Sequence, residues 1–372
     1  MDAIRSVEAM MLAAPGQTGA YGGPYGFLVR VVTEDGVTGW GEADSHPAIL
    51  RAVVEASFHF DGMSGLAAVL TGRPAGDIGG AWQAMAGATL NVGRDGITRM
   101  AMAAVDIALW DIAGKSQGKP VHALLGQRRH DGFGWYGSCG LGPTLEETAV
   151  LARRLKASGA RAGKFGWVPL GQSAAGDEAI VATLRETLGP DTGLLIDGGL
   201  AFDTDSAIAR SRMMARHGVH WFEEPLAGYD RDGYRRLRRV SPVPIAAGEM
   251  ASTAGELIGL IEGGCVDIVQ IDLSRIGISQ AMRVAEVAER HGVACVNHTY
   301  SMAMNTAASL HVMAVIPRVD LFEMQVLPNA LREALTPGWP AIVDGRVQVP
   351  QGPGLGVEPD PEALARFTVR EG

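Results

Sequence analysis

The sequence is poor in the features that mark several large classes of protein. It has three cysteines in 372 residues, Cys139, Cys265 and Cys295, which are too few and too widely spaced for a disulfide framework or a zinc ribbon. No apolar run approaches the roughly 20 residues that cross a membrane. Residues 1–15 carry Asp2 and Glu8 and lack the apolar centre of a signal peptide. The sequence therefore predicts a cytoplasmic protein without a membrane partner.

Positive charge is also scarce, because 32 Lys and Arg stand against 41 Asp and Glu, a formal net charge of −9. An acidic chain is a poor match for nucleic acid or for an anionic membrane surface, so we expect neither as a partner. Hydrophobic residues make up 47% of the chain, which is enough for a packed core. Glycine is abundant, at 50 residues without a collagen-like period, and this predicts many tight turns and helix ends.

The first 126 residues differ in pattern from those that follow. Residues 27–33 alternate like a strand, and 37–42 look like the returning strand of a hairpin. Residues 47–118 have helical periodicity, strongest over 98–115. The N-terminal part is therefore predicted to be an α+β unit.

Eight short apolar stretches then alternate with amphipathic helical ones, and their starts lie 23 to 32 residues apart. Parallel strands need crossovers of this length, and eight such units close a (β/α)8 barrel. An open doubly wound sheet gives the same alternation, but no G-x-G-x-x-G follows the first strand, which weakens the dinucleotide-binding version of it. The predicted strands are 134–139, 161–166, 193–198, 219–224, 243–249, 266–272, 293–298 and 318–324.

We predict an α/β protein with a TIM barrel at residues 127–339. An α+β capping domain at residues 1–126 precedes the barrel, and the C-terminal segment 340–372 returns to complete that cap.

The predicted strands end in ionisable residues, and chemistry in a barrel takes place at these carboxyl-terminal strand ends. One buried acid there could equally cap the next helix. Four consecutive strands ending in carboxylates would repel each other unless a cation or protons intervene. Oxygen-only ligands favour a hard ion such as Mg²⁺. The residues are Lys164, Asp197, Glu223, Glu224, Glu249, Asp272, His298 and Glu323.

Two further stretches resemble the enolase superfamily. Residues 104–115 (AVDIALWDIAGK) and 118–126 (GKPVHALLG) are similar to the signature that joins its cap to its barrel, and the likeness extends to the PGLGV of residues 353–357. The carboxylate series is similar to the mandelate racemase subgroup. Asp197, Glu223 and Glu249 match its three metal ligands, with steps of 223 − 197 = 26 and 249 − 223 = 26 residues, while Asp272, His298 and Glu323 match its Asp–His dyad and the acid of its eighth strand.

The resemblance implies removal of the proton α to a carboxylate in a small-molecule substrate, with Mg²⁺ as cofactor and a homo-oligomeric assembly. Asp197, Glu223 and Glu249 would hold the ion. His298 would act as base or acid, with Asp272 fixing its tautomer, and a protonated Glu323 would donate a hydrogen bond to the substrate carboxylate. A core histidine and a helix cap are the alternatives for His298 and Asp272. Glu224 lies on the opposite side of its strand from Glu223, so it is expected to support the site or anchor a loop.

The sequence departs from the subgroup at two glycines. Lys164-Phe165-Gly166 stands where Lys-x-Lys is frequent, so Lys164 keeps the role of carboxylate contact or base while Gly166 replaces the second lysine. Gly199 stands where asparagine is frequent, and the strand-six lysine of the muconate cycloisomerase branch is absent from residues 272–275. A racemase needs proton donors on both faces of its substrate. We therefore predict a lyase that dehydrates an acid sugar to a 2-keto-3-deoxy acid, with a racemase or epimerase of a 2-hydroxy acid second and a non-catalytic barrel binding protein third.

The cap is expected to set the specificity. Residues 16–26 and the Asp44–His46 turn are predicted to form a lid over the barrel, with glycines as hinges. Tyr21, Tyr25 and His46 are candidate substrate contacts, although ordinary loop residues explain them equally well.

Overall fold

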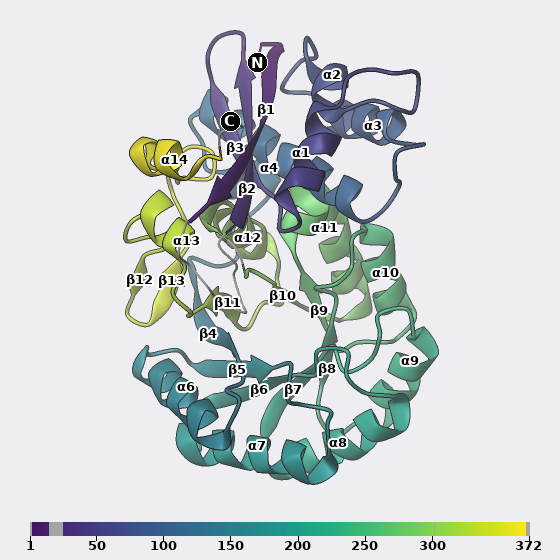
Figure 1. The fold of residues 1–372 in the computed structure, drawn as a ribbon, viewed down its shortest axis with the longest axis vertical. Helices are drawn as coiled ribbons and strands as arrows, with labels where there is room; N and C mark the ends of the chain where they lie inside the picture. Colours follow the sequence, from purple (N-terminus) through teal and green to yellow (C-terminus); the bar gives the residue numbers. More distant parts are fainter. Residues whose placement is uncertain (1, 15–24, 301, 370–372) are drawn as a thin grey trace.

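The computed structural model describes residues 2–14, 25–300 and 302–369, and Figure 1 shows them as two parts. The upper part is an antiparallel sheet in the order β1-β2-β3, with four helices beside it. This confirms the predicted hairpin and the long helix that follows. The elements are β1 (Ile4–Ala13), β2 (Tyr25–Thr33), β3 (Thr38–Glu42), α1 (Pro47–Glu55), α2 (Leu66–Leu70), α3 (Ile78–Ala88) and α4 (Ile97–Gln117).

The lower part is a barrel of eight parallel strands, as predicted. Neighbouring strands pair in chain order from β4 to β10, and β11 pairs with β4 on the other side. The strands are β4 (Gly132–Gly140), β5 (Ala162–Gly166), β6 (Gly193–Asp197), β7 (Val219–Glu223), β8 (Ile245–Ala247), β9 (Ile268–Ile271), β10 (Ala294–Asn297) and β11 (Phe322–Gln325).

Helices follow the strands and surround the barrel in Figure 1. Several begin at residues that the sequence provides as caps; Thr144, for example, forms a capping box with Glu147. The helices are α5 (Val121–Leu125), α6 (Leu145–Ala157), α7 (Ala174–Leu188), α8 (Thr204–Arg216), α9 (Arg231–Val240), α10 (Ala254–Glu262), α11 (Leu273–His291), α12 (Ala303–Val315) and α13 (Ala330–Leu335).

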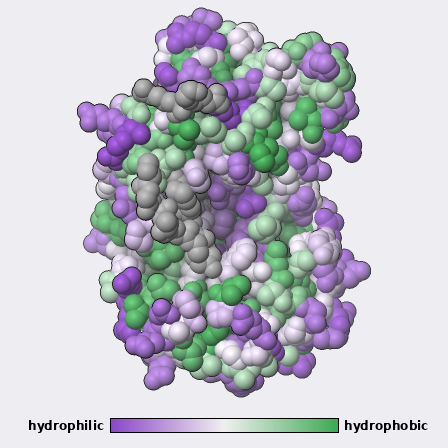
Figure 2. Space-filling model, in the orientation of Figure 1, coloured by the Kyte–Doolittle hydropathy of each residue, from purple (hydrophilic) through white to green (hydrophobic). Residues whose placement is uncertain are grey.

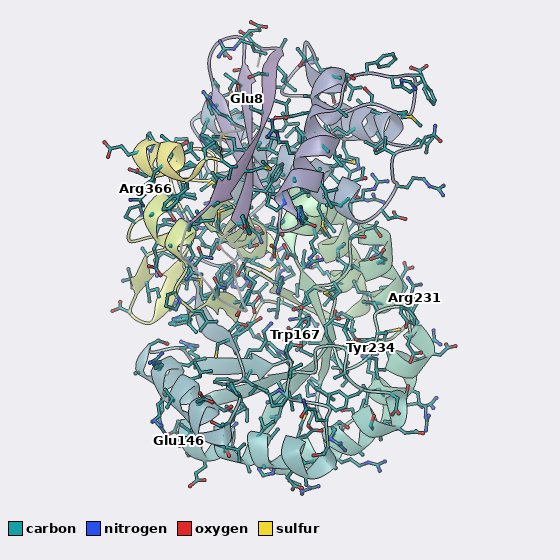
Figure 3. The ribbon with its side chains drawn as sticks, in the orientation of Figure 1. Glu8, Glu146, Trp167, Arg231, Tyr234 and Arg366 are labelled. Atoms are coloured by element: carbon teal, nitrogen blue, oxygen red, sulfur yellow. The ribbon has the colours of Figure 1, made fainter. Side chains whose placement is uncertain are left out.

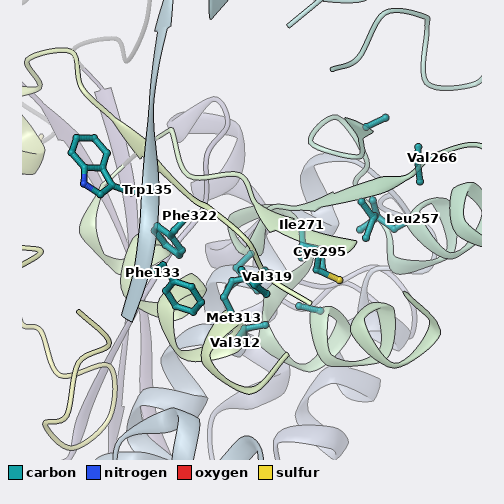
Figure 4. Close-up of a cluster of buried hydrophobic side chains, with 14 of the residues drawn as sticks. Phe133, Trp135, Leu257, Val266, Ile271, Cys295, Val312, Met313, Val319 and Phe322 are labelled. Atoms are coloured by element: carbon teal, nitrogen blue, oxygen red, sulfur yellow. The ribbon is translucent and has the colours of Figure 1, made fainter. Parts of the chain in front are cut away.

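Two apolar layers lie on either side of the barrel wall. Outside it, buried side chains of strands and helices pack together, including the stacked rings of Phe133 and Phe322, whose centroids are 5.7 Å apart (Figure 4). Inside it, one layer of apolar side chains from six strands packs together and fills the interior of the barrel at that level. The inner layer consists of Tyr136, Ala162, Leu195, Trp221, Ala246 and Val296.

The chain after the barrel touches both parts of the molecule. β12 (Ile342–Val343) and β13 (Arg346–Gln348) form a hairpin, and β13 pairs antiparallel with β4. After α14 (Pro361–Phe367), the amide of Val369 donates a 2.8 Å hydrogen bond to the carbonyl of Met11 in β1. Residues 342–348 therefore lie against the barrel, and the last described residues lie against the cap sheet.

In the described part of the chain, no helix is both long enough and apolar enough to cross a membrane.

Candidate active site

A layer of ionisable side chains lies next to the inner apolar layer, because both point into the barrel from the same strands. Side chains two residues apart on a strand point to the same side. Lys164, Asp197 and Glu223 therefore follow Ala162, Leu195 and Trp221 on the inward side. The same step of two leads from Val296 to His298 and from Leu321 to Glu323. These groups gather at the carboxyl-terminal ends of the strands, called the barrel mouth below.

Three carboxylates come together at the mouth. Asp197 and Glu223 are register partners on β6 and β7. Glu249 lies beyond the end of β8, after Gly248, whose φ of +136° favours glycine. One carboxylate oxygen from each of the three lies within 4.8 Å of the others, and all three residues are buried. This is a geometry in which a single metal ion could contact all three side chains.

The charge of the three carboxylates is only partly balanced by protein cations, Lys164 beside Glu223 and His298 beside Glu249. Burial raises the pKa of Asp197 well above its usual range, and the charges of Glu223 and Glu249 add to that effect. Burial likewise raises the pKa of Glu249 to about 8. Glu249 Oε2 is buried and accepts no hydrogen bond from a described residue, although His298 Nε2 is 3.3 Å away. Such a cluster fits a cation with oxygen ligands.

Lys164 lies among the acids. Its Nζ donates to Glu223 Oε1, is 2.8 Å from Glu323 Oε1 and is 3.8 Å from Glu249 Oε2. Burial alone would lower the pKa of Lys164, but the charges of Glu223 and Glu323 hold it well above its usual range. The same lysine holds the pKa of Glu223 below its usual value, against the effect of burial. Lys164 is therefore a cation of the site and not a surface lysine.

Asp272 and His298 form a hydrogen-bonded pair. His298 Nδ1 is 2.7 Å from Asp272 Oδ2. Asp272 Oδ1 accepts from the amide of Ser274, at 2.8 Å, and thereby caps α11. Both interpretations of Asp272, helix cap and partner of His298, fit this geometry, because each carboxylate oxygen has its own hydrogen-bond partner. His298 Nε2 is left facing the carboxylate of Glu249.

The surroundings of His298 favour its charged form. Burial would lower its pKa, but the carboxylates of Glu249, Glu323 and Asp272 raise it to about 10. Burial would raise the pKa of Asp272, but the hydrogen bond and the charge of His298 lower it below its usual value. A cation bound to Glu249 would remove part of the negative charge that His298 faces, so the protonation of the histidine is coupled to the occupancy of the carboxylate cluster.

The remaining two acids have different surroundings. Glu323 Oε2 accepts a hydrogen bond from the amide of Thr299, at 2.8 Å, just after His298 in the chain. Glu224 turns away from the carboxylate cluster, as alternation predicts. Its Oε1 accepts from the amide of Gly248, at 2.8 Å, so it anchors the turn that carries Glu249.

A cavity of about 440 Å³ opens above these groups, and Figure 2 shows a hollow between the two parts of the molecule with hydrophilic residues at its base. Of the predicted site residues, Lys164, Asp197, Glu249 and His298 line this cavity, and so does Gly166. The lining also includes residues that the sequence analysis did not name as substrate contacts. The additional residues are Asp44, Ser138, Cys139, Gly140, Trp167, Met250, Arg275 and Tyr300.

The cap residues chosen from the sequence have a different outcome. His46 and Tyr25 are exposed, Tyr25 by 67%, and neither lines the cavity. Tyr21 and most of the predicted 16–26 lid lie outside the described residues. Asp44, two residues before His46, lines the cavity instead. Position in the sequence could have identified two of the missed residues. Trp167 directly follows Gly166, and Arg275 lies three residues after Asp272, so both are next to residues that the sequence already placed at the strand ends.

Comparison with known proteins agrees with this fold. Residues 19–126 match the family "mandelate racemase / muconate lactonizing enzyme, N-terminal domain", and residues 147–363 match "enolase C-terminal domain-like". The chain therefore belongs to the mandelate racemase subgroup of the enolase superfamily, a class of enzymes.

Individual relatives differ in their reactions. The chain is 31% identical to D-galactarolactone cycloisomerase of Agrobacterium fabrum, over 91% of this chain and 90% of the relative. It is 29% identical to D-gluconate dehydratase of Thermoproteus tenax, over 99% of this chain and 74% of the relative. The structure of a racemase from Streptomyces coelicolor with bound magnesium superimposes with a TM-score of 0.86 at 28% identity, covering 98% of this chain and 100% of that one.

Proposed function

We propose that the protein removes the proton α to the carboxylate of a hydroxylated sugar acid and then expels the oxygen substituent on the β-carbon, giving a 2-keto-3-deoxy acid. The observation that carries this proposal is the placement of the Asp272–His298 pair and Lys164 around the carboxylate cluster, with Lys164, Asp197, Glu249 and His298 lining one cavity. The names of the relatives support it, since a dehydratase and a lactone cycloisomerase are both among them. The less specific alternative, a non-catalytic barrel, predicts no such cluster.

We assign Mg²⁺ to Asp197, Glu223 and Glu249. An all-oxygen donor set suits Mg²⁺, and Glu249 Oε2 accepts no hydrogen bond from a described residue; its nearest cationic atom is His298 Nε2, at 3.3 Å. The magnesium in the Streptomyces coelicolor relative supports the choice of ion. When bound, the ion would act as a Lewis acid that makes the α-proton of a carboxylate substrate more acidic.

The protein's own groups then move the proton. In the neutral form of the imidazole, His298 Nε2 takes the α-proton and returns a proton to the departing β-oxygen, while Asp272 holds the ring through Nδ1. Glu323 and the Lys164 ammonium orient the substrate carboxylate. In an alternative assignment of the two roles, Lys164 is the base and His298 is the acid. Exchange of the α-hydrogen in D₂O separates the two, because only the variant that lacks the base loses exchange.

Gly166 supports elimination over racemisation. A Cβ at this position would lie 2.4 Å from both Cβ and the carbonyl oxygen of Asp197, closer than real Cβ contacts approach. A lysine in the place of Gly166 is therefore incompatible with this backbone. Inversion needs a proton donor on each side of the α-carbon, whereas elimination is complete with one dyad.

The test is a screen of the purified protein with Mg²⁺ against aldonates, aldarates and their lactones, with 2-keto acid as the measured product. We expect 2-keto acid from at least one of them. Stereoinversion of a hydroxy acid without 2-keto acid would replace the proposal with a racemase or epimerase. Absence of both, with no α-hydrogen exchange, would overturn catalysis of this class.

A further inference from the structure

Two glycines at which the chain departs from its subgroup flank one tryptophan. Gly166 precedes Trp167 directly. Gly199 lies against it, since a Cβ on Gly199 would be 3.1 Å from Cδ2 and 3.3 Å from Cγ of the indole. The absence of a side chain at Gly199 thus leaves room for the Trp167 ring, and its absence at Gly166 leaves room for Asp197, to which that ring is bonded.

Trp167 is held in an unusual conformation. Its φ of +68° lies in the left-handed region, which costs a residue with a side chain about 1–3 kcal/mol and is found mostly at functional sites. The indole Nε1 donates to Asp197 Oδ2 at 3.0 Å, and the Trp167 carbonyl accepts from the amide of Leu170 at 2.9 Å. These contacts fix the direction of the ring.

The fixed ring forms a wall of the cavity. Trp167 is 39% exposed although its polar atom is paired, so its accessible surface is largely the carbon skeleton of the indole. Figure 3 labels it near the centre of the molecule. Met250, 42% exposed, adds a second apolar side chain to the lining, whereas Arg275 and His298 are charged groups of the same cavity. A ligand that fills this space needs one apolar face and one polar face.

We propose that Trp167 is a specificity-determining residue whose indole stacks on the C–H face of a ring-closed sugar acid, a lactone or an anhydro ring. The inference rests on the proposed function. A sugar ring presents several C–H groups together on one face, and these pack on an aromatic plane. An open-chain acid has hydroxyls along its whole length, and one buried against the indole carbon atoms would lose its hydrogen bond to water.

A ring-closed substrate changes which bond breaks, and the atoms balance without water. The base removes the α-hydrogen, and the C–H electron pair forms the double bond to the β-carbon. The bond between the β-carbon and the ring oxygen breaks, and that oxygen keeps the electron pair. A lactone leaves it as a carboxylate, and an anhydro ring leaves it as a hydroxyl after protonation. The enol then becomes a 2-keto-3-deoxy acid, an isomer of the substrate.

The experiment compares kcat/KM for aldarolactones with that for the corresponding open-chain aldarates, in wild type, Trp167→Phe and Trp167→Leu. We expect wild type to prefer the ring by at least about 10-fold, and Trp167→Leu to raise KM for the ring roughly 10- to 100-fold with a smaller change for the open chain. Trp167→Phe keeps a ring but not the hydrogen bond to Asp197, and so retains most of the preference. Tyr229→Leu, which removes an aromatic ring that is 90% exposed and outside the cavity lining, is the matched control.

Calorimetric binding of the lactone to His298→Asn, with and without Trp167→Leu, checks the same contact without turnover, and we expect weaker binding in the double variant. Equal use of ring and open-chain acids, or an equal loss for both in Trp167→Leu, overturns the inference and leaves the proposed function intact. No product and no α-hydrogen exchange from either acid in wild type overturns the proposed function itself, and the inference with it.

Discussion

On one side of the cavity, the ends of β9 and β10 present Asp272 and His298, joined by a 2.7 Å hydrogen bond. On the other side, the ends of β5 and β6 present Gly166, Trp167 and Asp197, and there the 3.0 Å hydrogen bond comes from a neutral indole. The first side can take and return a proton. The second can hold an ion and an apolar surface. In the proposed assignment with His298 as base, both proton transfers take place on the first side, whereas Lys164, which lies in β5 on the second side, holds the substrate carboxylate.

The largest expected effect is on the proton-transferring side. His298→Asn removes the group at Nε2 while leaving an amide that can still donate to Asp272. We expect kcat to fall by about 10²- to 10⁴-fold, the usual contribution of a general acid–base residue. Initial rates of 2-keto acid formation measure it, and an unchanged melting temperature confirms that the variant is folded. Full turnover by this variant would remove the functional difference between the two sides.

The next effect belongs to the opposite side. Asp197→Asn takes away one of three charges near the proposed Mg²⁺ position, so we expect Mg²⁺ to bind at least about 10-fold more weakly in calorimetry. The exposed Asp191→Asn, with the same change in charge, is the control. We also expect a chelator to abolish turnover and added Mg²⁺ to restore it. Unchanged affinity in Asp197→Asn would move the ion away from this side.

A third test concerns the backbone at Gly166, which keeps a second lysine out of the side that already carries Lys164. Gly166→Ala places a Cβ 2.4 Å from Asp197, so we expect the free energy of unfolding to fall by about 1–3 kcal/mol, together with weaker Mg²⁺ binding. Gly87→Ala is the matched control, since an added Cβ meets nothing within 4 Å in helix α3 and is expected to stabilise by about 0.5–1 kcal/mol. Urea unfolding measures both. A Gly166→Ala protein as stable as wild type would mean that this side can accept a side chain.

The two sides also differ in how far the sequence predicts them. Strand alternation and length place Lys164, Asp197, Glu223, His298 and Glu323 correctly at the mouth, because inward residues repeat every second position. Their roles as ligands and catalysts stay predictions. Trp167 and Glu249, however, lie just beyond the ends of β5 and β8, where the alternation of strand side chains no longer applies. Alternation therefore could not predict where the side chain of Trp167, with its φ of +68°, or that of Glu249 points.

The cap was harder still, because loop contacts depend on how one domain sits on another. No periodicity distinguishes Asp44 from His46, and only the packing of the loop shows which of them lines the cavity. Tyr25, a predicted substrate contact, is exposed and lies outside the cavity lining. Residue type identified candidates in the cap, but it could not rank them.

The smallest expected effects distinguish Asp44 from His46. They test whether the cap contributes a side chain to the part of the cavity that holds Asp272 and His298. Asp44 lies where burial and the charge of Asp272 raise its pKa, opposed by Arg275 and His298. Asp44→Asn removes a charge that balances Arg275 beside the dyad, so we expect kcat/KM to fall about 10-fold. His46→Asn should stay within about twofold of wild type, because the imidazole is exposed and outside the cavity. Steady-state kinetics on both variants decides this. An equal loss in the two would mean that the whole Asp44–His46 turn moves over bound substrate, and the cap would then act as a lid and not as a fixed extension of the dyad side.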